Sequence, residues 1–357
     1  MNNFNFSVPQ TKIGGKSDVF LLEDPKDRKR YFSYKAGQEI EKIREFLRHG
    51  SFMAFLLGPK NSGKGTYSKL FAEAVGSERI RHISVGDIVR GVHMSMDSES
   101  GKNKLFSFLE ANYRGPLSIS DAVDSLLGRN ASALLPTEFI LALLKKEIKE
   151  AEGKAIFVDG FPRNLDQISY SLYFRTLMGY EDNPDFFVFI DVPENIIIER
   201  IKNRVVCPKC HVPRSLRLLK TKEVVYDAEE KKFYLICDNP VCGGPRMVEK
   251  EGDSLGIEVI RDRVEMDKKV IETLINMHGI PKIYLRNSVP VSFAKESVDD
   301  YEITPAYSYE FDTKNNRVAV STSPWVINDD EGVPSYSLLP APIVVSLIRQ
   351  VVSVLNL

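Results

Sequence analysis

Residues 58–66 read Gly-Pro-Lys-Asn-Ser-Gly-Lys-Gly-Thr, between an apolar run at 52–57 and a helical pattern at 67–75. Strand, glycine loop and helix together form the context in which such a loop cradles phosphate. Glycines let the backbone N–H groups turn inward, Lys64 adds a point charge, and the helix N-terminus adds its positive dipole end. The alternative is a glycine turn that only joins a strand to a helix. The loop residues predicted to bind phosphate are Gly58, Asn61, Ser62, Gly63, Lys64, Gly65 and Thr66.

Further apolar runs indicate a buried parallel sheet. Strands are predicted at 79–83, 155–159 and 186–191, with helical patterns between them. Continuously apolar strands that alternate with helices are typical of an α/β fold in which helices cover both faces of the sheet. We expect an inserted helical subdomain between residues 91 and 132, and a final helix at 343–355.

The N-terminal segment is predicted to be irregular. Residues 1–30 are polar and contain prolines and glycines, which favours a partly disordered arm or a loosely packed extension. A helix is predicted only from 36 to 48, where Ile40, Ile43, Phe46 and Leu47 have helical spacing.

Composition excludes several classes of protein. The chain has 357 residues, a formal net charge of -1, 43% hydrophobic and 27% charged residues. The charge balance does not favour a nucleic-acid or membrane partner. The sequence contains no run of membrane-spanning length and no pattern of a secretory signal, so we expect a cytoplasmic protein, and a monomer.

All four cysteines lie between residues 207 and 242, as the pairs Cys207-x2-Cys210 and Cys237-x4-Cys242. Two close pairs of thiolates are the ligand set of a structural zinc site. His211 is an alternative ligand, and four unrelated reduced cysteines are the other interpretation. A site with four protein ligands has no open position, so this zinc would stabilise structure rather than catalyse.

Several motifs resemble those of adenylate kinases, and they occur in the same order as in that family. The Gly-Lys-Gly-Thr spelling of the phosphate loop is typical of nucleoside monophosphate kinases. The resemblance continues in the stretches 82–90, 134–138, 159–163 with Gln167, and 199–204. It extends over about residues 52 to 263. The resemblance implies a P-loop kinase with a helical subdomain that binds the nucleoside monophosphate (NMP) and a lid resembling a zinc ribbon.

The resemblance also implies a role for each matching residue. Arg90 and Arg163 would hold the α-phosphate of the acceptor, Arg200 would lie against the donor ATP, and Arg204 would contact the transferring phosphate. Independently of the family, Asp159 ends a strand beside the loop and could hold the water shell of Mg²⁺. The expected catalytic residues are Lys64, Asp159, Arg163, Arg204, Arg261 and Arg263. The expected NMP-binding residues are Val85, Arg90, Leu134, Leu135, Gly160, Arg163 and Gln167.

Five segments follow from these assignments. Residues 1–35 form an N-terminal extension and 36–357 the kinase domain. Within the kinase domain, 84–150 is the acceptor subdomain, 205–255 the zinc lid and 287–340 a segment that the resemblance does not cover.

AMP is the favoured acceptor, because the carboxamide of Gln167 can pair with a base edge. Val85 and Asn164 instead favour a UMP/CMP-type kinase. In the lid, Lys250 or Arg246 would replace an arginine of the family, and lysine lacks its bidentate grip. A catalytically impaired nucleotide-binding or scaffold protein is therefore the other alternative. A zinc-ribbon nucleic-acid binder would need a basic surface.

Overall fold

The computed structural model describes residues 6–14, 18–128, 136–151, 153–168, 184–210, 212–250 and 261–357. In this part of the chain, no helix is both long enough and apolar enough to cross a membrane.

The centre of the molecule is a five-stranded parallel sheet with the strand order β10-β4-β1-β3-β2. Its strands are β1 (Met53–Leu57), β2 (Ile80–Ser84), β3 (Ala155–Asp159), β4 (Asp185–Asp191) and β10 (Lys282–Arg286). All five residues of β1 are buried, as expected for a central strand that is covered on both faces. The strands predicted from the apolar runs are confirmed.

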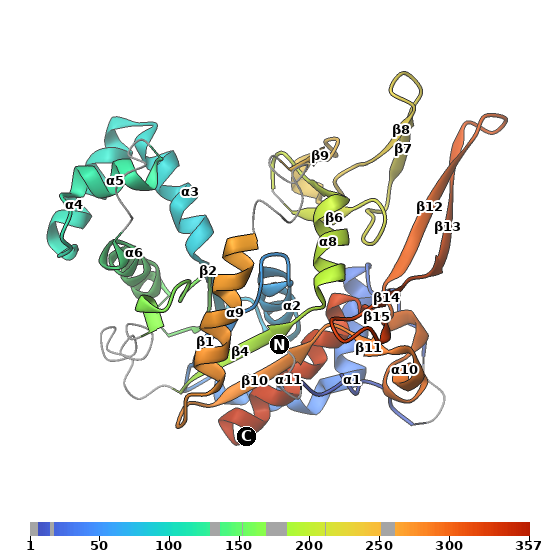
Figure 1. Cartoon of the computed structure of the whole chain (residues 1–357), viewed down its shortest axis with the longest axis horizontal. Helices are drawn as coiled ribbons and strands as arrows, with labels where there is room; N and C mark the ends of the chain where they lie inside the picture. Colours follow the sequence, from blue (N-terminus) through green and yellow to red (C-terminus); the bar gives the residue numbers. More distant parts are fainter. Residues whose placement is uncertain are drawn as a thin grey trace.

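Helices cover both faces of the sheet (Figure 1). Along β1, Ala54 and Leu56 pack towards one helical layer, and Phe55 packs towards the other, as the alternation of strand side chains requires. The first layer contains α1 (Pro25–Phe46), α2 (Lys64–Val75), α8 (Glu194–Lys202) and α11 (Pro340–Leu355). The second layer contains α6 (Thr137–Glu150) and α9 (Arg261–Ile275). The predicted α/β class is therefore confirmed.

Two insertions rise above the sheet on opposite sides of α9 (Figure 1). The helical insertion has its own apolar core and consists of α3 (Val85–Met96), α4 (Glu99–Asn112) and α5 (Ile119–Leu126), packed against α6. The lid has a small core around the cysteines. Its elements are β5 (Arg204–Val206), β6 (Pro213–Ser215), β7 (Val224–Asp227), β8 (Lys232–Leu235), the 3-10 turn η1 (Pro240–Cys242) and β9 (Val248–Glu249).

The C-terminal segment adds a small sheet and a long hairpin. The sheet consists of β11 (Val289–Pro290), β14 (Val326–Asn328) and β15 (Pro334–Tyr336), beside α10 (Val291–Ser297) and η4 (Asp300–Glu302). The hairpin consists of β12 (Pro305–Asp312) and β13 (Arg317–Pro324).

This hairpin packs against the β7–β8 hairpin of the lid, and both extend away from the sheet (Figure 1). The rings of Tyr226 and Phe311 stack with centroids 4.5 Å apart, and those of Phe233 and Tyr309 lie 5.5 Å apart. We call these four residues the aromatic bridge. The backbone N–H of Tyr307 also donates to the carbonyl of Arg217 at 2.8 Å. The lid therefore contacts the C-terminal segment as well as the sheet domain.

The expectation of a loose N-terminal segment is wrong for its described residues. Helix α1 begins at Pro25, where the Asp24 side chain accepts from two backbone N–H groups. Before it, Phe20 and Leu22 are buried in the main core. Helix α1 is kinked at Ala36, where φ is -150° and ψ is 30°, so its two halves meet at the boundary predicted at residue 35.

A buried ion cluster holds this helix to the C-terminal segment. The ammonium of Lys35 lies 2.6 Å from a carboxylate oxygen of Asp299 and 3.6 Å from one of Glu302. Tyr31 and Thr11 donate hydrogen bonds to Glu302. Burial, followed by the charge of Glu302, raises the pKa of the Tyr31 phenol well above its usual value. No sequence pattern indicated that Lys35 faces the core, because a lysine breaks the apolar pattern.

We predict that Lys35→Ala lowers the free energy of unfolding by about 3–5 kcal/mol, because it leaves two carboxylates buried without a counter-charge. Urea denaturation measures this. Arg30→Ala is the matched control on the same helix: Arg30 pairs with Asp27 at the surface, so its loss should cost about 0–1 kcal/mol. Equal losses for the two variants would contradict the prediction.

Candidate active site

The glycine loop turns sharply between β1 and α2. Asn61 and Gly63 have φ values of 69° and 103°, in the left-handed region. A Cβ atom on Gly63 would lie 2.7 Å from the ring of Tyr67, so the position requires glycine. Lys64, the first residue of α2, donates to the carbonyl oxygens of Gly58 and Pro59 at 2.6 and 2.9 Å. Burial lowers the pKa of its ammonium, and the charge of Asp159 partly opposes this.

Buried polar atoms at this loop lack partners. Among the described residues, Nδ2 of Asn61, Oγ of Ser62 and Nε2 of His82 are buried and form no hydrogen bond. Leaving a buried donor unsatisfied costs about 1–3 kcal/mol. An oxygen-rich ligand seated at the loop could accept from the two loop side chains.

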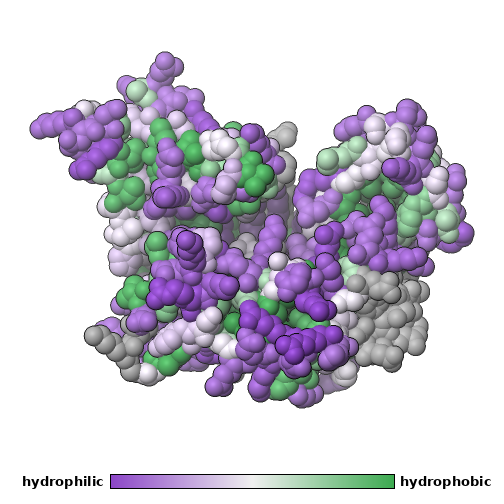
Figure 2. All heavy atoms as spheres, turned by 180° about the vertical axis from the view of Figure 1, so that it is seen from behind, coloured by the Kyte–Doolittle hydropathy of each residue, from purple (hydrophilic) through white to green (hydrophobic). Residues whose placement is uncertain are grey.

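A cavity of about 590 Å³ opens above the loop. Figure 2 shows the molecule hollowed between its two upper lobes, the lid and the helical insertion. Of the described residues that line the cavity, nine are cationic and Asp159 is the sole carboxylate. The cations are Lys60, Lys64, Lys69, Arg163, Arg200, Arg204, Arg214, Lys250 and Arg263. The chain as a whole has a net charge of -1, so positive charge is concentrated here.

Arg200, on α8, is held between the loop and the C-terminal segment. Its guanidinium donates to the backbone oxygen of Asn61 at 3.1 Å and to Oδ1 of Asn287 at 3.0 Å. The amide of Asn287 is fully buried and donates to the hydroxyl of Tyr67 at 2.8 Å and to the carbonyl of Leu338 at 3.1 Å. The hydroxyl of Ser337 donates to Oδ1 of Asn287 at 2.8 Å. Asn287 thus positions Arg200, and no sequence motif indicated it.

Arg163 is held in the loop that follows β3. Its Nε donates to the carbonyl of Gly160 at 2.8 Å, and its backbone N–H donates to Oε1 of Gln167 at 2.8 Å. Gly160 has a φ of 86°, and a Cβ there would lie 2.7 Å from the guanidinium. Burial lowers the pKa of Arg163, and the neighbouring charge of Arg263 lowers it further.

Acidic groups lie beside these cations. Asp159 ends β3 with 18% of its side chain exposed, and its carboxylate lies 3.9 Å from His82. Burial lowers the pKa of His82, which favours the neutral imidazole. On α9, burial raises the pKa of the Asp267 carboxyl, whereas the charges of Lys64 and Arg263 lower it. No sequence motif indicated Asp267; its spacing of four residues from Arg263 on a helix was the available signal.

Some of the candidate cationic residues of the lid and of α9 line the cavity, and others do not. Lys250 and Arg263 line the cavity. Arg246 instead pairs with Asp227 and Glu230 within the lid. Arg261 is directed towards Glu194 of α8, with 3.9 Å between the charged atoms, and is not among the lining residues. Arg204 lines the cavity and donates to the side chain of Asn61.

The residues expected to bind the acceptor are only partly gathered. Val85 is buried at the start of α3, and Arg90 is exposed on the same helix and pairs with Asp87. Neither lines the cavity. Leu134 and Leu135 lie outside the described residues, as does His211.

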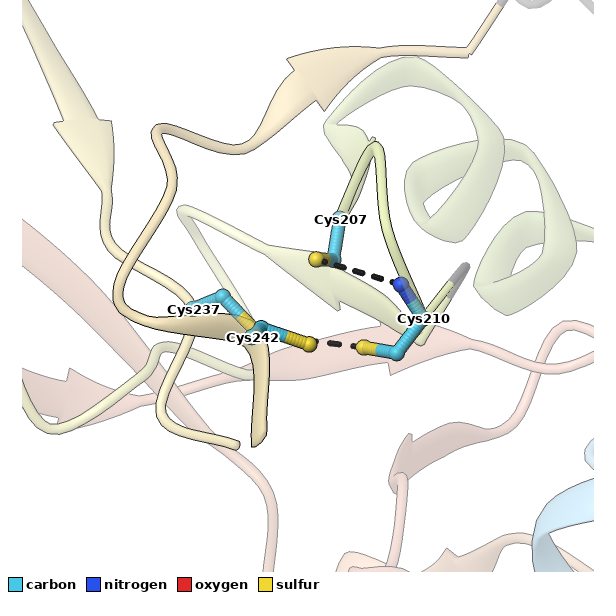
Figure 3. A group of neighbouring side chains, drawn as sticks. All are labelled: Cys207, Cys210, Cys237 and Cys242. Atoms are coloured by element: carbon cyan, nitrogen blue, oxygen red, sulfur yellow. Dashed lines mark hydrogen bonds between the residues drawn. The ribbon is translucent and has the colours of Figure 1, made fainter. Parts of the chain in front are cut away.

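The four cysteines converge in the lid. Figure 3 shows the two pairs facing one another from separate segments. Their sulfur atoms all lie within 4.8 Å of one another, with 3.8 Å between those of Cys210 and Cys237. A tetrahedral site with Zn–S bonds of about 2.3 Å has sulfurs about 3.8 Å apart, so the geometry fits zinc.

The thiol of Cys207 is more acidic than an ordinary cysteine thiol. Burial would raise its pKa, but the backbone N–H groups of Cys210 and Lys209, with the thiols of Cys237 and Cys210, bring the pKa to about 6. A thiolate at neutral pH is the form that binds a metal.

The sheet, the glycine loop and the cationic cavity define a P-loop α/β protein with a nucleotide site. A family model described as an AAA domain matches residues 57–206. The adenylate kinase of Petrotoga mobilis is 31% identical over 221 residues, which are 62% of this chain and 82% of that protein.

The adenylate kinase of Clostridium tetani is 30% identical over 231 residues, 64% of this chain and 88% of that protein. That of Kosmotoga olearia is 28% identical over 214 residues, which cover 60% and 81% of the two chains. The chain belongs to the adenylate kinase family.

We predict that the purified chain contains one zinc ion and that Cys237→Ser loses most of it, because a thiolate ligand is removed. Metal analysis by mass spectrometry checks both expectations. Val241→Ser is the matched control, because Val241 lies between Cys237 and Cys242 but is 92% exposed and has no ligand atom. Full zinc occupancy in Cys237→Ser would contradict the assignment.

We predict that Asn287→Ala weakens ATP binding about tenfold or more, because Arg200 loses an acceptor that is worth about 1.5–3 kcal/mol. Calorimetric titration measures the Kd. Asn195→Ala is the control: Asn195, on α8 like Arg200, donates to the carbonyl of Asn328 at 2.8 Å and does not line the cavity, so the Kd should not change. An unchanged Kd in a folded Asn287→Ala protein would rule out this positioning role.

Proposed function

We propose that this chain is an adenylate kinase that transfers the γ-phosphoryl group of ATP to AMP. One observation carries the proposal: nine cationic side chains and one carboxylate, among the described residues, surround a cavity above the glycine loop. Phosphoryl transfer spreads negative charge over the moving group, so the protein acts by positioning reactants and stabilising charge. The names of the related proteins support this reaction in particular.

The donor phosphates would lie at the glycine loop. Backbone N–H groups at the start of α2, the side chains of Asn61 and Ser62, and the ammonium of Lys64 would receive them. Arg200 and Arg204 would hold the donor from the α8 and lid side, because both donate to the loop itself.

The acceptor phosphate would face Arg163 and Arg263, which lie close enough for the charge of Arg263 to lower the pKa of Arg163. An arginine offers phosphate two parallel hydrogen bonds, which fixes the orientation of the group. Arg90 and Arg261 remain candidates for this step.

Magnesium is the metal that the kinase family implies. Asp159 fits it, because this partly exposed carboxylate ends a strand beside the loop and is the one acid among the described residues that line the cavity. Carboxylates and retained waters are the ligands that Mg²⁺ prefers. Bound with ATP, the ion would neutralise phosphate charge.

Gln167 and Asn164 bear on the choice of acceptor. Oδ1 of Asn164 accepts from the backbone N–H of Gln167 at 2.9 Å, so Asn164 has a local role in shaping the loop. This weakens its value as a sign of a UMP/CMP-type kinase. Gln167 is buried and does not line the cavity, and its carboxamide oxygen already accepts from the backbone N–H of Arg163. Only its amide nitrogen, which has a long contact of 3.5 Å with Thr137, would be available to a base.

We also propose that residues 84–150 bind the acceptor and that 205–255 form a lid that closes over the reactants. Lid closure would exclude water from the transferring group. Lys250 and Arg263 at the cavity favour a catalytic protein over an impaired scaffold.

A coupled assay with AMP, CMP, UMP and GMP tests the proposal, and AMP is expected to be the best acceptor. Lys64→Ala should lower kcat at least about 100-fold, because a donor to the developing charge is lost. Lys29→Ala, on α1 away from the loop, is the matched control and should retain full activity. A different preferred acceptor would overturn the adenylate kinase assignment, and binding of ATP without any turnover would identify the impaired alternative.

A further inference from the structure

The C-terminal segment contributes to the wall of the cavity. Six residues between 304 and 340 line it: Thr304, Trp325, Ser337, Leu338, Leu339 and Pro340. The sequence resemblance ended near residue 263 and left this segment without a role. Its contribution differs from that of the loop side, because three of the six are large apolar side chains.

Trp325 is the largest of these side chains. It joins β13 to β14, and 5% of its surface is exposed. The rest packs in the main core, which also contains Leu338 and Leu339. Because Trp325 is packed in this way and lines the cavity, the ring is held rigidly at the cavity wall. Leu218, from the lid, belongs to the same core and lines the same cavity.

The cavity is therefore lined by two chemically different groups of residues. The glycine loop and its cations provide charge for phosphates, and Trp325 with the leucines provides an apolar and aromatic surface. A nucleoside triphosphate has the same division between its phosphates and its flat base. Aromatic side chains stack on bases with about 1–3 kcal/mol per base.

We infer that Trp325 is a donor-binding residue that packs against the base of ATP. The inference rests on the proposed function, because it takes the cavity to be the donor site. It assigns to the C-terminal segment the recognition of the donor nucleoside, whereas the acceptor phosphate would face Arg163 and Arg263.

The wild-type chain allows a direct test, because Trp325 is its only tryptophan. Tryptophan fluorescence therefore reports this position alone. Titration with Mg·ATP should change the emission in a saturable manner, with the Kd found by calorimetry. Inorganic tripolyphosphate, which has phosphates and no base, should bind with little change in emission. AMP should also change it little.

Variants give a second readout. Trp325→Ala should raise the KM for ATP roughly 5- to 150-fold, which corresponds to about 1–3 kcal/mol of lost stacking, and leave the KM for AMP unchanged. Trp325→Phe retains an aromatic face and should restore most of the affinity. Val326→Ala is the matched control, because the neighbouring side chain is 47% exposed and does not line the cavity.

The outcomes separate this inference from the proposed function. If wild-type protein binds and turns over ATP but its emission does not respond, the inference is wrong and the kinase assignment stands. If wild-type protein neither binds nor turns over ATP, both fail. Should Trp325→Ala not fold, the wild-type fluorescence titration and Trp325→Phe decide the question.

Discussion

Repulsion between like charges is the constraint under which this site is built. Nine cationic side chains of the described residues share one cavity, and the positive charge of Arg263 lowers the pKa of both Arg163 and Lys64. The structure holds several of them with neutral oxygen atoms. Lys64 contacts carbonyls of its own loop, Arg163 the carbonyl of Gly160, and Arg200 the side chain of Asn287. Neutral acceptors fix the geometry of these cations and leave their charge for an anionic ligand.

The same constraint explains why the site draws on separated parts of the chain. A buried side-chain amide such as that of Asn287 needs hydrogen-bond donors for its oxygen and acceptors for its nitrogen. Tyr67 comes from the loop helix and Ser337 from the C-terminal segment, and both meet at this amide. The C-terminal segment is therefore part of the wall of the cavity. It also supplies Asp299 and Glu302, which fix α1 through Lys35.

Much of the fold could be predicted because the relevant signals are local. Apolar strands such as 155–159 are continuous, and the glycine loop and the cysteine pairs have diagnostic spacing. The residues missed were those whose role depends on distant partners. In the sequence Lys35 resembles a surface lysine, and only the fold brings Asp299 beside it. Asn287 belongs to no motif. The choice between Arg261 and Arg263 required the direction of each side chain on α9, which spacing alone does not give.

The aromatic bridge has a mechanical consequence. Tyr226 and Phe233 on the lid hairpin pack against Phe311 and Tyr309, and β13 ends one residue before Trp325. A rotation of the lid hairpin must either carry the β12–β13 hairpin with it or slide two pairs of rings past each other. In the first case the movement is transmitted along the β12–β13 hairpin to its base beside Trp325. Opening of the lid would then strain the part of the cavity wall against which the base of ATP would pack. In the second case the aromatic bridge slows the movement of the lid, without altering its open and closed positions.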